Sequence, residues 1–538
     1  MSIEIIETHQ QTLGENVLLY PLLRQLNVAE IINQQVKSEA EIPLGSVAEI
    51  LILSRFAKKR IPMYHLSGFC EKSGIDILYD IEAEKLNDDR VGRCLDAMAP
   101  DLAELKTTLI LRAIKIFDLT VCQIHTDITN ILFEGSYQGL GDDQLKVCWG
   151  HTKKGQDPRC KQVNFSLSVT ADGGVPLWYE AVDGNTSDSV CYTPHLKALE
   201  KELGINHPLV IGDSKLVSHG NMLAFCRAGA HFIGPATLDK KEKKRLKTLW
   251  KQGGVFSELE YKALHGAPIP YWGLETERTI IDKKRKQRFV IRQIYTFSRQ
   301  RREVVRHTRA KAFLKAKAAL HKIIRCLNKY DYKTQQVIHS RLQSQVIKKC
   351  RYYQIQLNED KESRFSISYA IDWQLMREDE MFDGIYLLRT NLKKDTFSMS
   401  AVLCSYKEQP QIERCFSTMK QPPIQVSPLW LHLPQRIESL LFIVLIALLI
   451  VMLLQREGRK KVAKKQIPLR VGGRDDLPLT AKVLLAAFDS IAIVSVTFIE
   501  NGSLRTEKKC TRLSPAQMQV LLALGFEPPS QYWVKSTI

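Results

Sequence analysis

The first 115 residues carry apolar side chains at the spacing of amphipathic helices. Apolar positions recur every three to four residues in ENVLLYPLLRQLNVAEIINQQV, in GSVAEILILSRFAKK and in the segment that begins LNDDRVGRCLDAM. This pattern predicts an all-α N-terminal domain over residues 1–115.

After residue 116 the spacing changes to the alternation that is typical of β-strands. β-Branched residues dominate LTVCQIHTDITNILFEG, and QVNFSLSVTA and GVPLWYEAV continue this character across turns that contain glycine. Three such segments in succession predict an antiparallel meander. Helices near PHLKALEKEL and HGNMLAFCRAG and strands in HPLVIGD and HFIGPA follow, so residues 116–236 are predicted to form a mixed α/β core.

Residues 237–371 are predicted to interrupt this core as a basic, β-rich insertion. RFVIRQIYTF and RFSISYAID alternate as strands do. Between them, the run from Arg299 to Lys329 mixes apolar and basic residues at helical spacing. The insertion is therefore expected to contain strands beside one basic helix.

The second part of the core, residues 372–455, is predicted from GIYLLRT onward. It includes a helix over roughly residues 405–420 and a run of 15 apolar residues from Leu440 to Leu454. A bilayer-spanning helix needs about 20 apolar residues, so a buried core helix is the better interpretation of this run. Residues 456–538 are predicted to form a C-terminal tail unit that begins with a basic linker over residues 456–465.

Length and composition narrow the class of protein. A chain of 538 residues can hold several domains, and its 44% hydrophobic and 25% charged residues exclude collagen-like, coiled-coil and largely disordered classes. The twelve cysteines form no C-x-x-C pair, and the N-terminus lacks the layout of a signal peptide. We therefore expect free thiols and a cytoplasmic location.

The net charge of +19 comes from one region of the chain. The segment from Lys240 to Cys350 holds 30 Lys and Arg against 8 Asp and Glu. Its basic runs are KKEKKRLK, DKKRKQR and the run that starts at Arg299; a solvated helix face explains any single run equally well. Three runs in one region favour a surface that binds nucleic-acid phosphates, with the candidate contacts Lys283, Lys284, Arg285 and Lys286.

Two aspartates occupy positions where a carboxylate needs a partner. Asp127 lies in a strand of otherwise apolar and neutral residues, and alternation places His125, Asp127 and Thr129 on one face. Asp213 ends the apolar strand LVIG, where α/β sheets display ligand-binding groups. Burying an ionised carboxylate is costly unless it is paired or binds a metal. The alternatives are a hydrogen-bonded strand residue for Asp127 and a helix N-cap for Asp213.

The helix expected near residue 410 supplies a third acid. Tyr406, Gln409, Glu413 and Lys420 are separated by three, four and seven residues, so they are predicted to share one helix face. An adjoining apolar stripe would pack this helix on the sheet, and it consists of Ile412, Phe416 and Met419. A solvated polar face is the alternative interpretation.

Glu413 could then join Asp127 and Asp213 at one site. Hard carboxylate oxygens suit Mg²⁺, and two such ions promote phosphodiester displacement. Tyr406 and Lys420 could hold phosphate by hydrogen bond and charge. Together with the basic region, these residues favour a metal-dependent DNA-processing enzyme.

These motifs resemble those of insertion-sequence transposases of the DDE class. The signature of that family is Tyr-x2-Arg-x3-Glu-x6-Lys, and YKEQPQIERCFSTMK matches it at Tyr406, Glu413 and Lys420, with Gln409 in place of the Arg. The blocks HTDIT, HTKKGQDPRCKQVNFSLSVTADGG, VIGD and DGIYLLRTN resemble blocks of the family in the same order. LNDDRVGRCLDAM is similar to the helical domain that often precedes such cores.

The resemblance implies an α/β fold: an RNase-H-like mixed sheet core with a β-rich basic insertion, preceded by the all-α domain. It implies that Asp127, Asp213 and Glu413 are the catalytic residues and bind two Mg²⁺ or Mn²⁺ ions. The separation of 200 positions from Asp213 to Glu413 matches the family's insertion at this place. The implied DNA-binding residues are Tyr406, Gln409 and Lys420, beside the basic residues 283–286.

The implied function is transposition. The enzyme would cut element-end DNA by metal-dependent phosphodiester hydrolysis and join the 3′ ends to target DNA. Its partners would be element ends with terminal inverted repeats, target DNA and a second copy of the chain, with no membrane, and it would be nucleoid-associated when bound to DNA.

Three alternatives stay open. One is a metal-dependent nuclease that cuts without joining, and another is an inactivated transposase that only binds DNA, since Gln409 lacks the charge of the family's Arg. The third is a protein of anionic membranes that uses residues 440–454 as an anchor.

Overall fold

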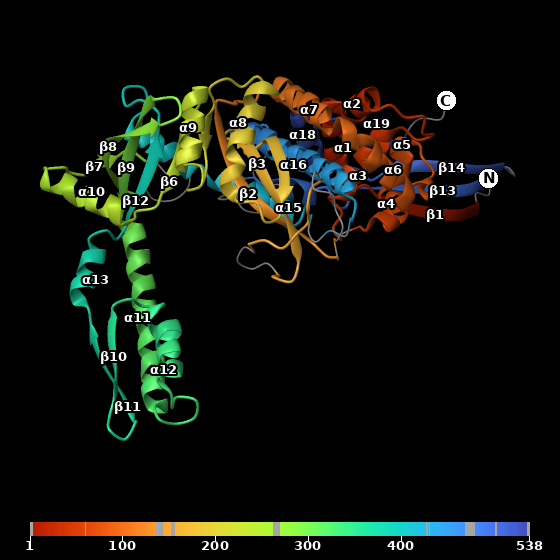
Figure 1. The fold of residues 1–538 in the computed structure, drawn as a ribbon. Helices are drawn as coiled ribbons and strands as arrows, with labels where there is room; N and C mark the ends of the chain where they lie inside the picture. Colours follow the sequence, from red (N-terminus) through yellow and green to blue (C-terminus); the bar gives the residue numbers. More distant parts are fainter. Residues whose placement is uncertain are drawn as a thin grey trace. The chain divides into compact units, whose positions relative to one another are not determined.

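The computed structural model describes residues 4–59, 61–135, 137, 144–151, 157–261, 269–424, 426, 429, 431–467, 479–500 and 503–534. Residues 152–156 of the HTKKGQDPR block thus lie outside the described residues. The chain divides into two compact units (Figure 1). We call Met1–Phe232 with Lys407–Ile538 the core unit, and Ile233–Tyr406 the insertion unit.

The core unit begins with one strand and a group of helices. The helices are α1 (Asn16–Leu26), α2 (Val28–Gln35), α3 (Leu44–Ser54), α4 (Leu66–Ser73), α5 (Ile75–Tyr79), α6 (Asp88–Met98) and α7 (Leu102–Phe117). The sequence marks several of their ends: the side chain of Asn87 caps α6 by accepting from the Arg90 amide. Most of the leucines and isoleucines that gave the helical spacing are buried, as Leu22, Ile50 and Leu109 are.

The expectation of an all-α N-terminal domain is wrong for its first residues. Strand β1 (Glu4–Thr12) pairs antiparallel with β13 (Ala492–Glu500), which pairs with β14 (Ser503–Cys510). A lone strand needs a partner for its backbone hydrogen bonds, and here the partner comes from the other end of the chain. Local periodicity in residues 1–12 therefore could not reveal it.

The C-terminal residues are part of the core unit. They contain α17 (Ala481–Ala486), α18 (Pro515–Leu524) and α19 (Pro529–Trp533) in addition to β13 and β14. The indole of Trp533 is buried and donates a 2.9 Å hydrogen bond to the carbonyl oxygen of Gly74. The tail thus packs on the N-terminal helices instead of standing alone.

The predicted meander forms the centre of the core unit. Strands β2 (Gln123–Phe133), β3 (Lys161–Thr170) and β4 (Pro176–Asp183) pair antiparallel, and β5 (Leu209–Ile211) runs parallel to β2, in the order β4-β3-β2-β5. Helix α8 (Tyr192–Lys201) follows β4 in the chain, and α9 (His219–Ala228) follows β5. This mixed sheet confirms the predicted α/β core.

The apolar run from Leu440 to Leu454 is a buried helix. It lies within α16 (Pro434–Ala463). By length and composition this helix could cross a membrane, but 94% of its most apolar 18-residue stretch is buried inside the structure. The predicted linker at residues 456–465 is wrong, because α16 continues through Ala463. Arg456 is buried there and pairs with Asp172.

The insertion unit contains a sheet of its own strands. Strand β6 (His231–Ala236) enters the unit, and the order is β6-β12-β9-β8-β7, with β12 (Ile385–Thr390), β9 (Gln287–Ser298), β8 (Tyr271–Asp282) and β7 (Ser257–Leu259). Helix α10 (Lys240–Lys251) packs on it through Leu246. Because β12 pairs with β9 and β6, the unit extends past residue 371 to Tyr406.

A helical arm, residues Arg299–Glu380, forms the rest of the insertion unit. It consists of α11 (Arg299–Cys326), α12 (Gln335–Leu342), a π-helical turn (Gln343–Ile347), the hairpin β10 (Tyr353–Glu359) and β11 (Phe365–Ile371), and α13 (Trp373–Glu380). Figure 1 shows α12 and the hairpin beside the long α11. Leu320, Ile323 and Ile338 belong to its own apolar core. The insertion is therefore rich in helix as well as strand.

The helix predicted over residues 405–420 is two helices, α14 (Met399–Lys407) and α15 (Pro410–Lys420). Pro410 explains the break, since proline has no amide proton and its ring clashes with the carbonyl four residues earlier. Proline is well tolerated at the first position of a helix, so α15 starts there. The four signature residues consequently do not lie along one continuous helix.

Candidate functional site

Asp127 and Asp213 lie on neighbouring parallel strands of the core unit. The register pairs Gln123 with Leu209 and His125 with Ile211, so continuing it by two residues sets Asp127 beside Asp213. Both aspartates are half-buried. The two predicted acids are thus brought together at the end of β5.

The carboxylate of Asp213 is held by two donors. The Tyr192 hydroxyl donates to Oδ1 of Asp213 at 2.7 Å, and the Lys215 amide donates to the same oxygen at 2.9 Å. The Asp213 amide in turn donates to the Tyr192 hydroxyl oxygen at 3.2 Å. Burial first, and then the charges of Asp213 and Asp127, raise the pKa of Tyr192 well above its ordinary value, so the hydroxyl keeps its proton.

The face of the sheet under α8 is polar although it is buried. His195 bridges Ser166 at 2.7 Å through Nε2 and Ser168 at 2.8 Å through Nδ1. Ser168 hydrogen-bonds Thr126, the residue before Asp127, at 2.7 Å. Burial lowers the pKa of His195 to about 3, so the ring is neutral and one nitrogen donates while the other accepts.

Helix α15 packs on β2 and β3 and carries Glu413. On one flank, Gln411 donates to the Ala171 carbonyl at 2.6 Å and Cys415 donates to the Gly174 carbonyl at 3.1 Å, both in the β3–β4 turn. Helical spacing places Gln409, Glu413 and Lys420 on the other flank. That flank therefore faces away from the β3–β4 turn.

The three predicted ligands do not converge in the described structure. Glu413 is exposed on α15, and the described part of the chain holds no group of three His, Cys, Asp or Glu side chains placed to bind a metal ion. The two aspartates suit a hard cation nonetheless, because both are partly exposed carboxylates on adjacent strands. Asp127 accepts from the Ile128 amide at 2.8 Å through Oδ1.

A second acid, Glu408, lies between the two helices and reaches the start of β2. It accepts from Gln123 Nε2 at 2.7 Å, and its Oε2 lies 4.0 Å from Nε2 of His125. His125 is fully buried, and its ring nitrogens have no hydrogen-bond partner among the described residues. Burial lowers the pKa of His125 to about 4, so this contact joins a neutral ring to the carboxyl and is no ion pair.

The remaining signature residues fall in different places. Tyr406 belongs to α14 in the insertion unit, where its ring lies 6.2 Å from that of Tyr386. Gln409 precedes α15, and its buried side-chain oxygen has no hydrogen-bond partner within the described residues. Lys420 is the last residue of α15 and is half-buried.

The four predicted phosphate contacts form the tip of the β8–β9 hairpin. Asp282, buried at the end of β8, accepts from the amides of Lys284 and Arg285 at 3.1 and 3.3 Å. Lys286 has a positive φ of 53°, which the tight turn requires. The turn exposes the basic side chains of residues 283–286 to solvent.

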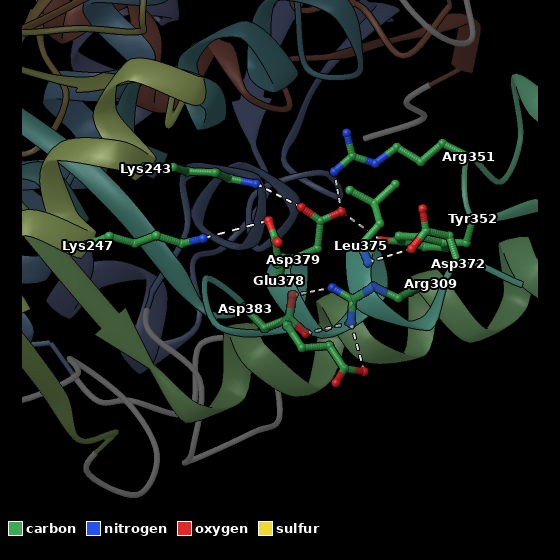
Figure 2. Close-up of polar contacts among 11 residues, drawn as sticks. Lys243, Lys247, Arg309, Arg351, Tyr352, Asp372, Leu375, Glu378, Asp379 and Asp383 are labelled. Carbon is green, nitrogen blue, oxygen red and sulfur yellow. Dashed lines mark hydrogen bonds and ion pairs between the residues drawn. The ribbon is translucent and has the colours of Figure 1, made fainter.

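Other basic residues of the insertion unit are neutralised inside it. Figure 2 shows Asp379 of α13 between Lys243 of α10, at 3.0 Å, and Arg351 of the arm. Lys247 pairs with Glu378 at 3.7 Å, and Arg309 of α11 pairs with Asp383. The acids Glu378 and Asp379 of α13 therefore fasten the arm to α10, and Asp383, which follows α13, fastens α11.

A buried glutamate neutralises two more arginines. Glu242 lies inside the basic run of α10 and accepts from Arg389 at 2.9 Å and Arg278 at 3.3 Å. The Tyr295 hydroxyl also donates to it at 3.0 Å. The basic run of α10 is thus partly structural.

One face of α11 stays basic and solvent-exposed. Between Glu303 and Asp331 the sequence has no acidic residue. Four exposed basic residues share this face, opposite the arm's apolar core: Lys311, Lys315, Lys322 and Arg325. This face and the hairpin tip are the candidate nucleic-acid surfaces of the insertion unit.

Sequence reasoning missed the polar groups behind the two aspartates. Tyr192 and His195 stand three residues apart, about one helical turn, in the predicted helix. In the predicted strand, Asn164, Ser166 and Ser168 alternate with apolar residues. Polar residues at every second position of a buried strand indicate that one face of the strand contacts other polar groups. NFSLSV shows this pattern, but its partner His195 lies 27 residues or more away in the sequence.

These features are consistent with the RNase-H-like core that the family resemblance implies: a mixed sheet with two carboxylates on adjacent parallel strands. The model of the transposase DDE domain family matches residues 124–450, more than half of the chain, and the chain belongs to this family. The protein is a transposase of a class that uses divalent metal ions. Residues 10–111 match a domain of unknown function, DUF4277.

Solved transposase structures show a distant similarity. The chain is similar to piggyBac transposase in a synaptic complex with hairpin DNA, with 9% identity over 88% of this chain and 78% of that one, at a TM-score of 0.35. It is also similar to Mos1 transposase in a paired-end complex with the left transposon end, with 10% identity over 36% and 60% of the chains, at a TM-score of 0.15. No curated protein sequence matches the chain.

Proposed function

We propose that this transposase cuts the ends of an insertion sequence and joins the 3′ ends to target DNA, with Asp127, Asp213 and Glu413 as its catalytic carboxylates. The observation that carries the proposal is the register of β2 and β5, which sets Asp127 beside Asp213. Helix α15 packs on β2, and its Glu413 flank faces away from the β3–β4 turn; we propose that this flank meets DNA beside the two aspartates.

Two divalent ions, Mg²⁺ or Mn²⁺, would be held by these carboxylates and would supply activation of the attacking oxygen and charge neutralisation. The protein's own part is positioning: the hydrogen bonds to Asp213 and the packing of α15 fix where the acids stand. Lys420 on the Glu413 flank would contact a phosphate near the cut, and Tyr406 is proposed as a DNA contact of the insertion unit.

The DNA would be held by the insertion unit. The exposed hairpin tip at residues 283–286 and the basic face of α11 present cations without intervening acids. Phosphate contacts of this kind bind DNA without regard to sequence. Because an element has two ends, we propose that two copies of the chain act together on DNA.

Cleavage of a labelled element end tests the proposal. We expect Asp127→Asn, Asp213→Asn and Glu413→Gln each to lower Mg²⁺-dependent cutting by at least about a thousandfold, because each removes a charged oxygen ligand. DNA binding, measured by mobility shift with Ca²⁺, should stay within about threefold of wild type. The substrate comes from the terminal inverted repeats that flank the gene.

Glu408→Gln is the matched control, since Glu408 lies on the opposite side of Pro410 and is outside the proposed triad. It should retain cutting. Loss of cutting in Glu408→Gln together with normal cutting in Glu413→Gln would replace the third carboxylate. Strand-transfer products with a target plasmid separate the transposase from a nuclease that only cuts.

A further inference from the structure

We propose that Tyr192 is a positioning residue for the metal site: its hydroxyl holds Asp213 so that one carboxylate oxygen stays available to the cation. This inference rests on the proposed function, because it assigns Tyr192 to the same pair of aspartates. Tyr192 is 1% exposed and is the first residue of α8.

Only one of the two carboxylate oxygens of Asp213 is hydrogen-bonded to described residues. Oδ1 accepts from the Tyr192 hydroxyl and from the Lys215 amide, whereas Oδ2 takes no hydrogen bond from any described residue. Two donors on one oxygen fix the rotation of the carboxylate group. Oδ2 is thereby left as the oxygen for a cation, as outer-shell donors commonly orient metal-binding carboxylates.

Tyr192 acts where the strand pairing stops. The β2–β5 ladder ends at His125 and Ile211, two residues before the aspartates. The Tyr192 hydroxyl lies 3.5 Å from the Thr126 carbonyl oxygen and 2.7 Å from Asp213. One buried group thus spans both strands next to the carboxylates, at the place where no ladder hydrogen bond holds them.

The ring itself is rigidly held. One turn along α8, His195 is bonded to Ser166 and Ser168 of β3, so the helix that bears Tyr192 is fastened to the sheet. Gly212 leaves room for the ring, because a Cβ at that position would lie 2.8 Å from Cε1 and 2.8 Å from the hydroxyl oxygen of Tyr192. The glycine before Asp213 is therefore required by the tyrosine.

Mn²⁺ binding to the full-length chain without DNA tests the inference, followed by the electron paramagnetic resonance signal of free Mn²⁺. We expect Tyr192→Phe, which removes only the hydroxyl, to weaken Mn²⁺ binding by about tenfold or more. The matched control is Tyr179→Phe, a buried tyrosine whose hydroxyl contacts the Glu438 carbonyl at 3.3 Å. It should stay within about twofold of wild type.

The outcomes separate the two proposals. If wild type shows no Mn²⁺ binding that Asp127→Ala removes, the proposed metal site fails and the role of Tyr192 fails with it. If wild type binds but Tyr192→Phe binds equally well, only the role of Tyr192 is overturned. Near-ultraviolet circular dichroism establishes that each variant is folded.

Gly212→Ala gives an independent reading should Tyr192→Phe fail to fold. Its Cβ would displace the ring and the hydroxyl, so it should weaken Mn²⁺ binding in the same direction as Tyr192→Phe. In a double variant the two losses should not add, because both act through one hydroxyl. A folded Gly212→Ala protein with wild-type Mn²⁺ affinity would overturn the inference.

Discussion

At the scale of single residues, the N-terminal helices contain a buried acid. Glu49 on α3 has no exposed surface; it accepts from the Tyr79 hydroxyl at 2.7 Å and from the Ala29 amide at 3.0 Å. Burial raises the pKa of Glu49 to about 7. Near pH 6 the folded protein therefore keeps a proton that the unfolded chain has already released.

This difference predicts a pH dependence of stability. Between the ordinary pKa of 4.5 and about 7 the folded state binds more protons than the unfolded state, so the free energy of unfolding falls as pH rises through that window, by on the order of 3 kcal/mol. Glu49→Gln should abolish this dependence and be at least as stable as wild type at pH 8. Urea denaturation at pH 5, 6, 7 and 8 measures it, and parallel curves for both proteins would contradict the prediction.

At the scale of elements, the acids of α13 hold the arm in place. Asp379 accepts from Lys243 and Tyr352, each at 3.0 Å, and from Arg351 (Figure 2). Burial alone would raise the pKa of Asp379, but the hydrogen bonds from Arg351, Lys243 and Tyr352 outweigh it and lower the pKa. The carboxylate is thus charged and shared by three donors.

Asp379→Asn is predicted to loosen α13. The amide cannot accept from three donors as a carboxylate does, and the loss of charge-assisted hydrogen bonds should cost about 2 kcal/mol locally. Hydrogen exchange of α13 and β10 amides measures the loss. Glu362→Gln is the control, because its pair with Arg364 is 70% exposed on both sides and contributes little. Unchanged protection in Asp379→Asn would contradict the role of α13.

At the scale of the whole molecule, the net charge of +19 hides two kinds of basic residue. Lys243 and Lys247 are paired with α13, whereas the hairpin tip at residues 283–286 is exposed. Only the second kind is free to release counterions on binding DNA. Charge along the sequence could not separate the two.

The salt dependence of DNA binding distinguishes them. Replacing Lys283, Lys284 and Arg285 with Gln and Lys286 with Asn, which tolerates the positive φ, should reduce the slope of log K against log salt by about 0.9 for each lost phosphate contact. Lys243→Gln with Lys247→Gln should leave the slope unchanged. Equal slopes for the hairpin variant and wild type would show that the basic side chains of the tip face solvent and make no phosphate contacts.

Much of the local structure followed from periodicity. The meander, the basic helix α11 and the buried α16 lie where alternation, 3.6-residue spacing and an uninterrupted apolar run predict them, because these signals are carried by neighbouring residues. The sequence also contains the cause of the break at Pro410. The prediction of one continuous helix from Tyr406 to Lys420 was wrong because it followed the spacing of the signature residues and not the proline between them.

Other features depend on partners far along the chain. Strand β1 needed β13, and the continuation of α16 past Leu454 needed Asp172 as the partner of Arg456. Within the site, the sequence identified Asp127, Asp213 and Glu413 one at a time. Their relation to Tyr192 and to the β3–β4 turn rests on hydrogen bonds between segments separated by 21 to 241 residues.

The sequence by itself determined the class of protein, the basic insertion and the identity of the acids, since motif, charge and periodicity are properties of short segments. Tertiary structure alone decided which acids stand together and which lysines are free. The physical reason is that strand register and ion pairing are settled between distant segments: the β2–β5 ladder puts Asp127 beside Asp213, and α13 neutralises Lys243 while the hairpin tip stays exposed.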